Sequence, residues 1–262
     1  PKDGMTWYDA YQAARAMTRT EGGIAYMGIG FQQLNPYLQF NPYGQDMWDA
    51  KTAKATMDGG KWPDIFKTLS AFFQIQGNPY MAGGPAGDAF IKERRMAMWI
   101  NYSSQFGNDA VIPADFNFDV VKVPTFKDAP GVGSGPQPLF FGIAATSKHK
   151  DQAFLAMAEM TSDQAQADRA KLGSTPTVKL PDLDKVLHVD NPKMKGKNIK
   201  GLTPVQYGPA TAPSPSGVDL RSYIVKAFET VATGKGDVNT ALRQANEDAN
   251  KKLEEKGVTP SK

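Results

Sequence analysis

The chain has 262 residues, a formal net charge of +3, 40% hydrophobic residues and no cysteine. This composition fits a globular protein of one large or two modest domains, and it excludes disulfide scaffolds and thiolate metal sites. Positive and negative charges are interspersed, so nucleic acid is not expected as a partner, and no apolar stretch approaches the ~20 residues of a membrane-spanning helix. Because the chain begins with Pro1 rather than Met, we expect a processed or truncated product.

The first hundred residues predict helices that alternate with strands. A helix is expected to begin at Thr6, because Thr6 and Asp9 form a capping-box pattern, and to end near the glycines at 22–23. A short strand is expected at 24–30. The elements expected after it are an aromatic and amide-rich stretch at 31–43, an amphipathic helix at 62–75, a helical turn at 88–95 and a buried strand at 96–100.

The rest of the chain continues the alternation. A strand is expected at 117–123, and the β-like run LFFGIAA at 139–145 leads into an apolar-periodic helix that begins close to His149. Ser162 lies at the start of another helix, which Gly173 ends. A proline-rich stretch at 176–217 and two final helices, at about 218–232 and 237–255, complete the chain. Alternating strands and helices predict the α/β fold class.

Patterns for catalysis and for metal or cofactor binding are mostly missing. The two histidines, His149 and His188, have no partner at the spacing of metal ligands, so no metal site and no cofactor are expected. The competing hypothesis is a glycan-acting enzyme. It would need two carboxyl groups about 5–10 Å apart across a cleft. Its candidate carboxylates are Asp46, Asp49 and Glu93.

Aromatic and amide side chains are concentrated where predicted strands end. Ligands of open α/β sheets bind outside the carboxyl ends of the strands. Aromatic faces stack on sugar rings, and amides and hydroxyls bond to sugar hydroxyls, so this set suits a neutral polyol better than an ion. The alternative is that the aromatic side chains only pack in the core or in loops. The candidate ligand-binding residues are Gln32, Gln33, Tyr37, Asn101, Tyr102, Ser103 and Gln105.

Four stretches in matching order make the chain resemble the C-terminal part of the family 1 extracellular solute-binding proteins. These are the sugar-type, maltose-binding-protein-like receptors of bacterial ABC importers. The stretches are PKDGMTWYDAYQAARAMTR, GDAFIKERRMAMWINYSS, VVKVPTFKDAPG and FFGIAATSKHKDQAFLAMAEMTSDQAQADRAKLGSTPT. Two departures stand out. Arg94 occupies a position where the family often has glycine, and Asn101-Tyr102 stands where many sugar receptors have glycine followed shortly by tryptophan.

The resemblance implies a periplasmic-binding-protein-like type II fold. Residues 1–138 would form the first part of the C-terminal lobe, 139–176 would belong to the N-terminal lobe, and 177–262 would return to the C-terminal lobe. Hinge crossings would fall near 138–142 and 174–178. Family members carry well over a hundred residues before the PKDGMTW-like entry, so the chain is expected to lack the start of its N-terminal lobe. Its exposed apolar edge would pair with that missing fragment or with a second chain.

The resemblance also implies a function without catalysis. The protein would capture a sugar or oligosaccharide between two lobes, with Tyr102 stacking on a ring, and would deliver it to the permease subunits of an ABC importer. Asp219 and Arg221 would add contacts, although Asp219 also fits a helix N-terminus. The location would be the extracellular face of the membrane, lipid-anchored in a Gram-positive, or the periplasm. Alternatives are a surface glycan-binding module and a receptor for a non-sugar solute such as ferric ion or a polyamine.

Overall fold

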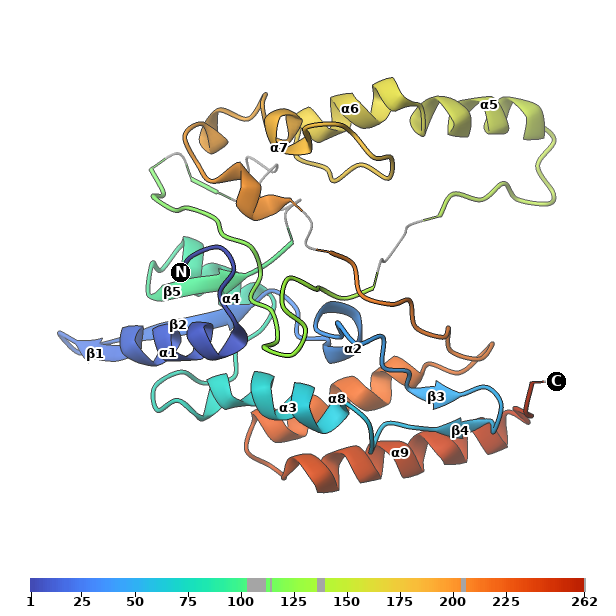
Figure 1. Ribbon diagram of the computed structural model, residues 1–262, viewed down its shortest axis with the longest axis horizontal. Helices are drawn as coiled ribbons and strands as arrows, with labels where there is room; N and C mark the ends of the chain where they lie inside the picture. Colours follow the sequence, from blue (N-terminus) through green and yellow to red (C-terminus); the bar gives the residue numbers. More distant parts are fainter. Residues whose placement is uncertain (103–111, 114, 136–139, 204–205, 262) are drawn as a thin grey trace. The chain divides into compact units, whose positions relative to one another are not determined.

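Helices and short strands alternate along the chain in the computed structural model, which confirms the α/β class (Figure 1). The structure describes residues 1–102, 112–113, 115–135, 140–203 and 206–261. Contacts divide the chain into two compact units, and neither is continuous in sequence. The first unit comprises Pro1–Asn101, Val123–Pro136 and Val205–Lys262, and the second comprises Tyr102–Lys122 and Gln137–Pro204. The predicted lobe boundaries at 138/139 and 176/177 stay predictions.

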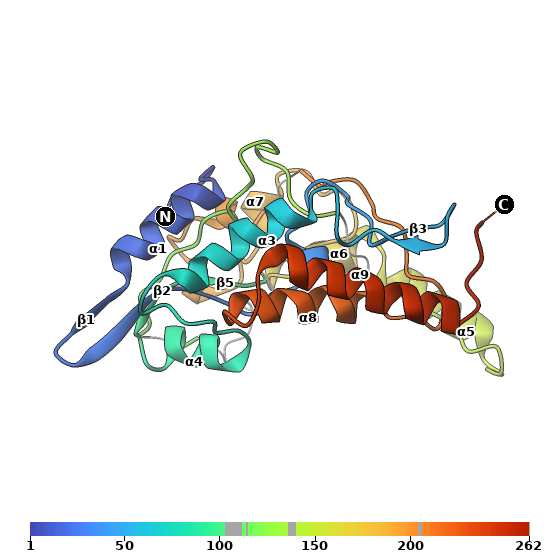
Figure 2. The ribbon, with the colours of Figure 1, turned by 90° about the horizontal axis from the view of Figure 1, so that it is seen from below.

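The first unit contains a three-stranded sheet in the order β1-β2-β5. Strand β2 (Ile24–Phe31) is parallel to β5 (Met96–Ile100) and antiparallel to β1 (Arg19–Glu21). Helix α1 (Trp7–Met17) lies on one side of this sheet and helix α4 (Gly84–Ile91) on the other (Figure 2). The strands predicted at 24–30 and 96–100 are therefore confirmed.

The capping box predicted for the first helix is confirmed, but its predicted end is wrong. The Asp9 amide donates to Thr6 Oγ1 over 3.2 Å, and the Thr6 amide donates to Asp9 Oδ2 over 2.8 Å. The helix ends at Met17, because the Thr18 side chain donates to the Ala14 carbonyl and accepts from the Gly28 amide. The glycines at 22–23, both with positive φ, form the turn of the β1–β2 hairpin instead.

Three helices form a layer of the first unit: α3 (Trp62–Ser70), α8 (Leu220–Ala232) and α9 (Val238–Glu255). The predicted helix at 62–75 is confirmed, with a last turn of 3-10 helix at Ala71–Gln74. The Phe66 and Phe228 rings meet edge to face at 5.2 Å, and both side chains are fully buried. The smaller elements of this unit are α2 (Pro36–Gln39) and the antiparallel pair β3 (Trp48–Asp49) and β4 (Lys54–Ala55).

The second unit is built from short helices and has a thin core. Its helices are α5 (Lys150–Met160), α6 (Asp163–Lys171) and α7 (Leu183–Val186), with 3-10 turns at Pro192–Met194 and Ile199–Leu202. Helix α6 begins where predicted, and Ser162 is its N-cap. Among the residues that the structure describes in this unit, the buried apolar side chains are Ile112, Phe118, Val120, Ala170, Leu187 and Met194.

Two strands predicted for this part of the chain are wrong. Residues 117–123 form no strand, because Asn198 takes the place of a neighbouring strand. Its amide donates to Asp119 Oδ1 over 2.9 Å, and its side chain donates to the Val120 carbonyl over 3.1 Å. Residues 140–145 of the LFFGIAA run also form no strand, and Phe140 and Phe141 are 87% and 52% exposed. Leu139 lies outside the described residues.

Candidate functional site

The carboxyl ends of β2 and β5 bring amide side chains to one edge of the sheet. Phe31 pairs with Ile100 in the parallel register, and the Gln32 amide donates to the Ile100 carbonyl over 2.8 Å. Gln32 and Gln33 leave β2 at the level at which Asn101 leaves β5. The structure therefore brings three of the predicted binding residues to neighbouring backbone positions, and Gln33 is exposed there.

The loop before α4 adds to the same edge. The Gly83 amide donates to the carbonyls of Phe31 (3.1 Å) and Gln32 (2.9 Å), so that α4 begins directly beside the end of β2. No side chain caps this helix, because its N-cap residue is a glycine. Polar backbone groups and amide side chains therefore share one edge of the first unit.

Trp99 lies near this edge and was missed by the sequence analysis. Its ring lies 5.6 Å from that of Phe90 on α4. Its indole Nε1 is buried and has no hydrogen-bond partner in the part of the chain that the structure describes. A buried indole N–H usually finds a partner. The sequence did contain a signal, because this tryptophan lies at the carboxyl end of the predicted strand at 96–100. That strand was interpreted only as buried, so the tryptophan was not considered as a binding residue.

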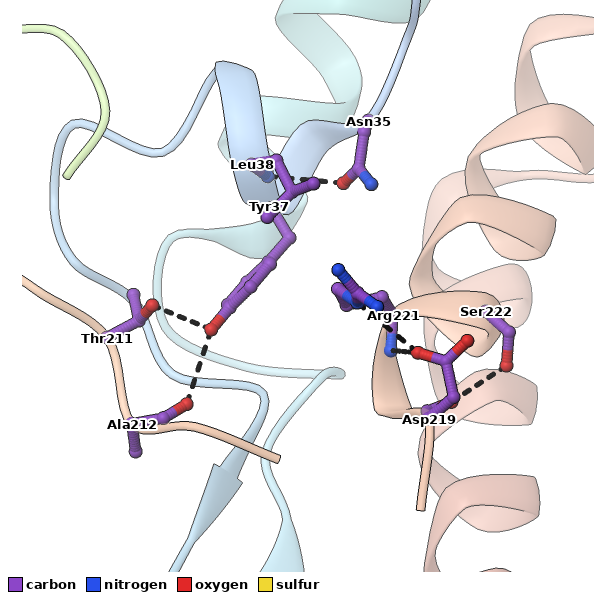
Figure 3. Close-up of polar contacts among 8 residues, drawn as sticks. All are labelled: Asn35, Tyr37, Leu38, Thr211, Ala212, Asp219, Arg221 and Ser222. Atoms are coloured by element: carbon purple, nitrogen blue, oxygen red, sulfur yellow. Dashed lines mark hydrogen bonds and ion pairs between the residues drawn. The ribbon is translucent and has the colours of Figure 1, made fainter. Parts of the chain in front are cut away.

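Tyr37 is buried, and its hydroxyl is engaged within the protein. The hydroxyl lies 2.6 Å from Thr211 Oγ1 and donates to the Ala212 carbonyl over 3.2 Å (Figure 3). Asn35 caps the short helix α2 by accepting from the Leu38 amide. Tyr37 therefore holds the segment at 211–212 against α2, and its predicted ligand contact stays a prediction.

Asp219 and Arg221 lie together at the start of α8. Asp219 is the N-cap of this helix, and its Oδ1 accepts from the Arg221 amide at 3.2 Å and from Arg221 Nε at 3.3 Å (Figure 3). The Ser222 hydroxyl donates to the Asp219 carbonyl over 2.8 Å. Helix α8 contacts α2, and Arg221 is exposed. The capping role noted for Asp219 from the sequence is thus present.

The remaining predicted residues belong to the second unit. Tyr102 is 43% exposed. Ser103 and Gln105 lie outside the described residues. The assignment of Tyr102, Ser103 and Gln105 to a ligand site therefore stays a prediction.

A charged cluster in the first unit engages another residue of the aromatic stretch. The Tyr43 hydroxyl donates to Asp128 Oδ1 over 2.5 Å, and Lys61 Nζ lies 2.7 Å from Asp128 Oδ2 and 4.8 Å from the centre of the Tyr43 ring. Burial and the hydrogen bond to Asp128 raise the pKa of Tyr43. The hydrogen bonds from Lys61 and Tyr43 lower the pKa of Asp128. Tyr43 is thus a neutral donor committed to a structural contact.

The carboxylates of the enzyme hypothesis make local contacts. Asp46 Oδ1 accepts from the Ala212 amide over 2.6 Å, Asp49 accepts from the Lys51 amide over 2.8 Å, and Glu93 pairs with Arg95. Within the described ranges, no group of three or more His, Asp or Glu residues could hold a metal ion. The geometry favours hydrogen bonding to a polar ligand at the end of the sheet.

Comparison with protein families decides where the chain belongs. The family described as bacterial extracellular solute-binding protein matches residues 1–167. The chain belongs to this family. Family membership and the observed fold confirm the resemblance stated from the sequence. This match covers the elements from α1 to α5 and the first part of α6, including the β2–β5 edge of this solute-binding protein.

Solved solute-binding proteins share the fold. The maltose/maltodextrin-binding domain of Bdellovibrio bacteriovorus, bound to maltotriose, is 17% identical with a TM-score of 0.65, covering 97% of this chain and 67% of its own. An ABC substrate-binding protein of Listeria monocytogenes in complex with cycloalternan is 18% identical with a TM-score of 0.64, covering 97% and 65%. A solute-binding protein of Thermotoga lettingae, bound with α-D-tagatose, is 19% identical with a TM-score of 0.62, covering 96% and 65%.

The solute-binding protein spans about two-thirds of the length of these structures. Comparison with curated proteins gave no match. Among the helices in the described ranges, none combines the length and apolar character that a membrane span requires.

Proposed function

We propose that this protein captures a sugar or oligosaccharide and delivers it to the permease subunits of an ABC importer, without catalysis. The observation that carries the proposal is the β2–β5 register, which places Gln32, Gln33 and Asn101 at one edge of the sheet. Amides both donate and accept, so they suit the hydroxyl groups of a sugar better than an ion. Three similar structures hold maltotriose, cycloalternan and tagatose, which supports this ligand class.

The proposed contacts are the binding residues predicted from the sequence, with one addition. Tyr102 stacks on a sugar ring, and Gln32, Gln33, Asn101, Ser103 and Gln105 bond to hydroxyls. Tyr37, Asp219 and Arg221 are further proposed contacts. Trp99 is added as a donor, because its buried indole N–H lacks a partner among the described residues. Closure of two lobes about a hinge would enclose the sugar.

The proposed location follows from the family, whose members are extracellular. We place the protein at the outer face of the cell membrane, held by a lipid anchor in a Gram-positive bacterium, or in the periplasm. A further polypeptide that completes the second unit is included among the proposed partners.

Calorimetric titration of the full gene product with a panel of mono- and oligosaccharides tests the proposal. We expect one sugar to bind, and Tyr102→Ala to weaken its binding about fivefold, because loss of stacking on one ring costs about 1 kcal/mol. Tyr8→Ala is the matched control, since Tyr8 is a 68% exposed tyrosine on α1. Undiminished binding by the Tyr102 variant removes Tyr102 from the site, and no binding of any sugar contradicts the ligand class.

Trp99→Phe tests the indole donor separately, because phenylalanine keeps an aromatic ring but has no N–H. We expect about fivefold to tenfold weaker sugar binding, the effect of one neutral hydrogen bond. Unchanged affinity in the same titration would limit Trp99 to packing against Phe90.

A further inference from the structure

Strand β1 pairs with only the first part of β2. The pairing ends at Tyr26, and side chains from two other segments bond to two of the backbone amides that follow. The Gly28 amide donates to Thr18 Oγ1 over 3.1 Å. The Ile29 amide donates to Asn78 Oδ1, also over 3.1 Å. The second part of β2 therefore depends on side chains as well as on its pairing with β5.

Asn78 is a fully buried amide that joins two distant elements. Its Oδ1 accepts from β2, and its Nδ2 donates over 3.0 Å to the Phe72 carbonyl in the 3-10 turn at Ala71–Gln74. Its own backbone amide donates to the Ile75 carbonyl over 2.9 Å. Removal of a buried side-chain amide leaves its former partners unsatisfied, which is costly. Asn78 therefore fastens the 3-10 turn to β2.

The residues after Asn78 follow β2 to its end. Ala82 forms a parallel bridge with Phe31. The Gly83 amide then donates to the carbonyls of Phe31 and Gln32. The segment at 78–83 is thus attached to β2 at both of its ends, first through a side chain and then through the backbone.

The 3-10 turn also contacts the last residue of β2. The Phe31 ring lies 6.0 Å from the Phe72 ring and 5.7 Å from the Phe73 ring. Phe31 is fully buried, and Gln32 follows it directly. A shift of the turn relative to β2 would therefore displace the residue that precedes the proposed glutamine contacts.

We propose that Asn78 is a positioning residue for the sugar site and acts through the end of β2. The inference rests on the proposed function, because its effect on binding is exerted through Gln32 and Gln33. Groups that contact a ligand bind it well when the residues behind them fix their geometry. The strength of each hydrogen bond also depends on its distance and angle. Loss of the Asn78 amide should therefore weaken sugar binding, although this buried side chain bonds to the protein backbone.

Asn78→Ala and Asn250→Ala form a matched pair for the test. Asn250 Oδ1 accepts from the Ala55 amide over 2.9 Å, so each variant removes a side-chain amide that bonds to the backbone of a strand. Both changes are made in the full gene product. Hydrogen exchange is followed by mass spectrometry without sugar. Affinities for maltotriose, cycloalternan and tagatose, the sugars in the similar structures, are measured by calorimetry.

We expect the amides at 29–33 to exchange about tenfold faster in Asn78→Ala than in Asn250→Ala, because the end of β2 opens more easily. We expect sugar affinity to fall about fivefold in Asn78→Ala, the effect of one neutral hydrogen bond, and to stay unchanged in Asn250→Ala. Unchanged exchange at 29–33 overturns the inference, and so does faster exchange with undiminished affinity. An equal loss of affinity in both variants also overturns it, because that result would reflect general destabilisation.

Asn78→Asp is a milder change that keeps the test decisive if Asn78→Ala does not fold. An ionised carboxylate still accepts from the Ile29 amide but cannot donate to the Phe72 carbonyl. We expect a sugar affinity between those of the wild type and Asn78→Ala, and undiminished affinity again overturns the inference. A wild type that binds none of the sugars counts against the proposed function instead, and the exchange at 29–33 then decides whether Asn78 holds the end of β2.

Discussion

Arg94 shows how a single backbone angle affects the turn between α4 and β5. Its φ is +55°, in the left-handed region that residues other than glycine rarely occupy. The turn is fixed on both sides, because the Glu93 amide donates to the Asp88 carbonyl and the Arg95 amide to the Ala89 carbonyl. The backbone of residue 94 is therefore held in the left-handed region, at an energetic cost for a residue that carries a side chain.

Replacing Arg94 with glycine is expected to raise the free energy of unfolding by about 1 kcal/mol, because glycine enters the left-handed region without a steric penalty. Urea denaturation followed by circular dichroism measures the change. Arg94→Ala is the control, since alanine removes the side chain but keeps the penalty. If the glycine variant is no more stable than the alanine variant, the turn is not strained.

Local patterns were predictable from the sequence, and distant partners were not. The capping box of Thr6 and Asp9 was identified because both side chains bond within the first turn of their own helix. The proximity of Gln32 and Asn101 was predictable because parallel strands end at one edge. The partner of the Tyr37 hydroxyl, Thr211, is 174 residues away, and no periodicity indicates such a contact. The strands predicted at 117–123 and 140–145 were wrong for a similar reason. A strand forms only where a neighbouring strand pairs with it, and the sequence pattern does not show that neighbour.

At the scale of elements, the capping box of α1 links stability to pH. The Thr6 amide and hydroxyl both donate to the Asp9 carboxylate, and these bonds lower the pKa of Asp9 from its ordinary value of 3.8. A lowered folded-state pKa means that the stabilisation is present above the ordinary value and is lost as the pH falls through the folded-state value.

Thr6→Ala is expected to cost about 1 kcal/mol of unfolding free energy at pH 7, the usual effect of losing a cap. Asp9→Asn is expected to lower the urea midpoint at pH 7, with a smaller difference from the wild type at pH 3 or below. Urea titrations at the two pH values check both variants. A difference for Asp9→Asn that is constant with pH would contradict the electrostatic part of the box.

At the scale of the whole molecule, the two units differ in how much apolar surface they bury. The first unit has fully buried aromatic side chains such as Trp62, Phe66 and Phe228, whereas the second has six buried apolar side chains in its described part and a helix, α5, with none. Local stability rises with the amount of buried apolar contact, so the second unit should open at a lower free energy than the first.

Hydrogen exchange of residues 1–262, followed by mass spectrometry, is expected to show amides of α5 exchanging at least a hundredfold faster than those of α8. A hundredfold ratio corresponds to about 2.7 kcal/mol of opening free energy. Equal protection of the two helices would show that the chain unfolds as a single cooperative unit. The β2–β5 amides serve as an internal reference within the first unit.

Helix α9 contacts an early part of the chain through two amide side chains. The Ala55 amide donates to Asn250 Oδ1 and the Met57 amide to Asn246 Oδ1, both over 2.9 Å. During translation the ribosome releases residues 55–57 long before residues 246–250 exist, and synthesis proceeds at about 5–20 residues per second. For roughly ten to forty seconds at that rate, the backbone amides of Ala55 and Met57 lack the side-chain acceptors on α9. The nascent chain thus has a period in which a chaperone can bind the β4 region, and this period ends when α9 emerges.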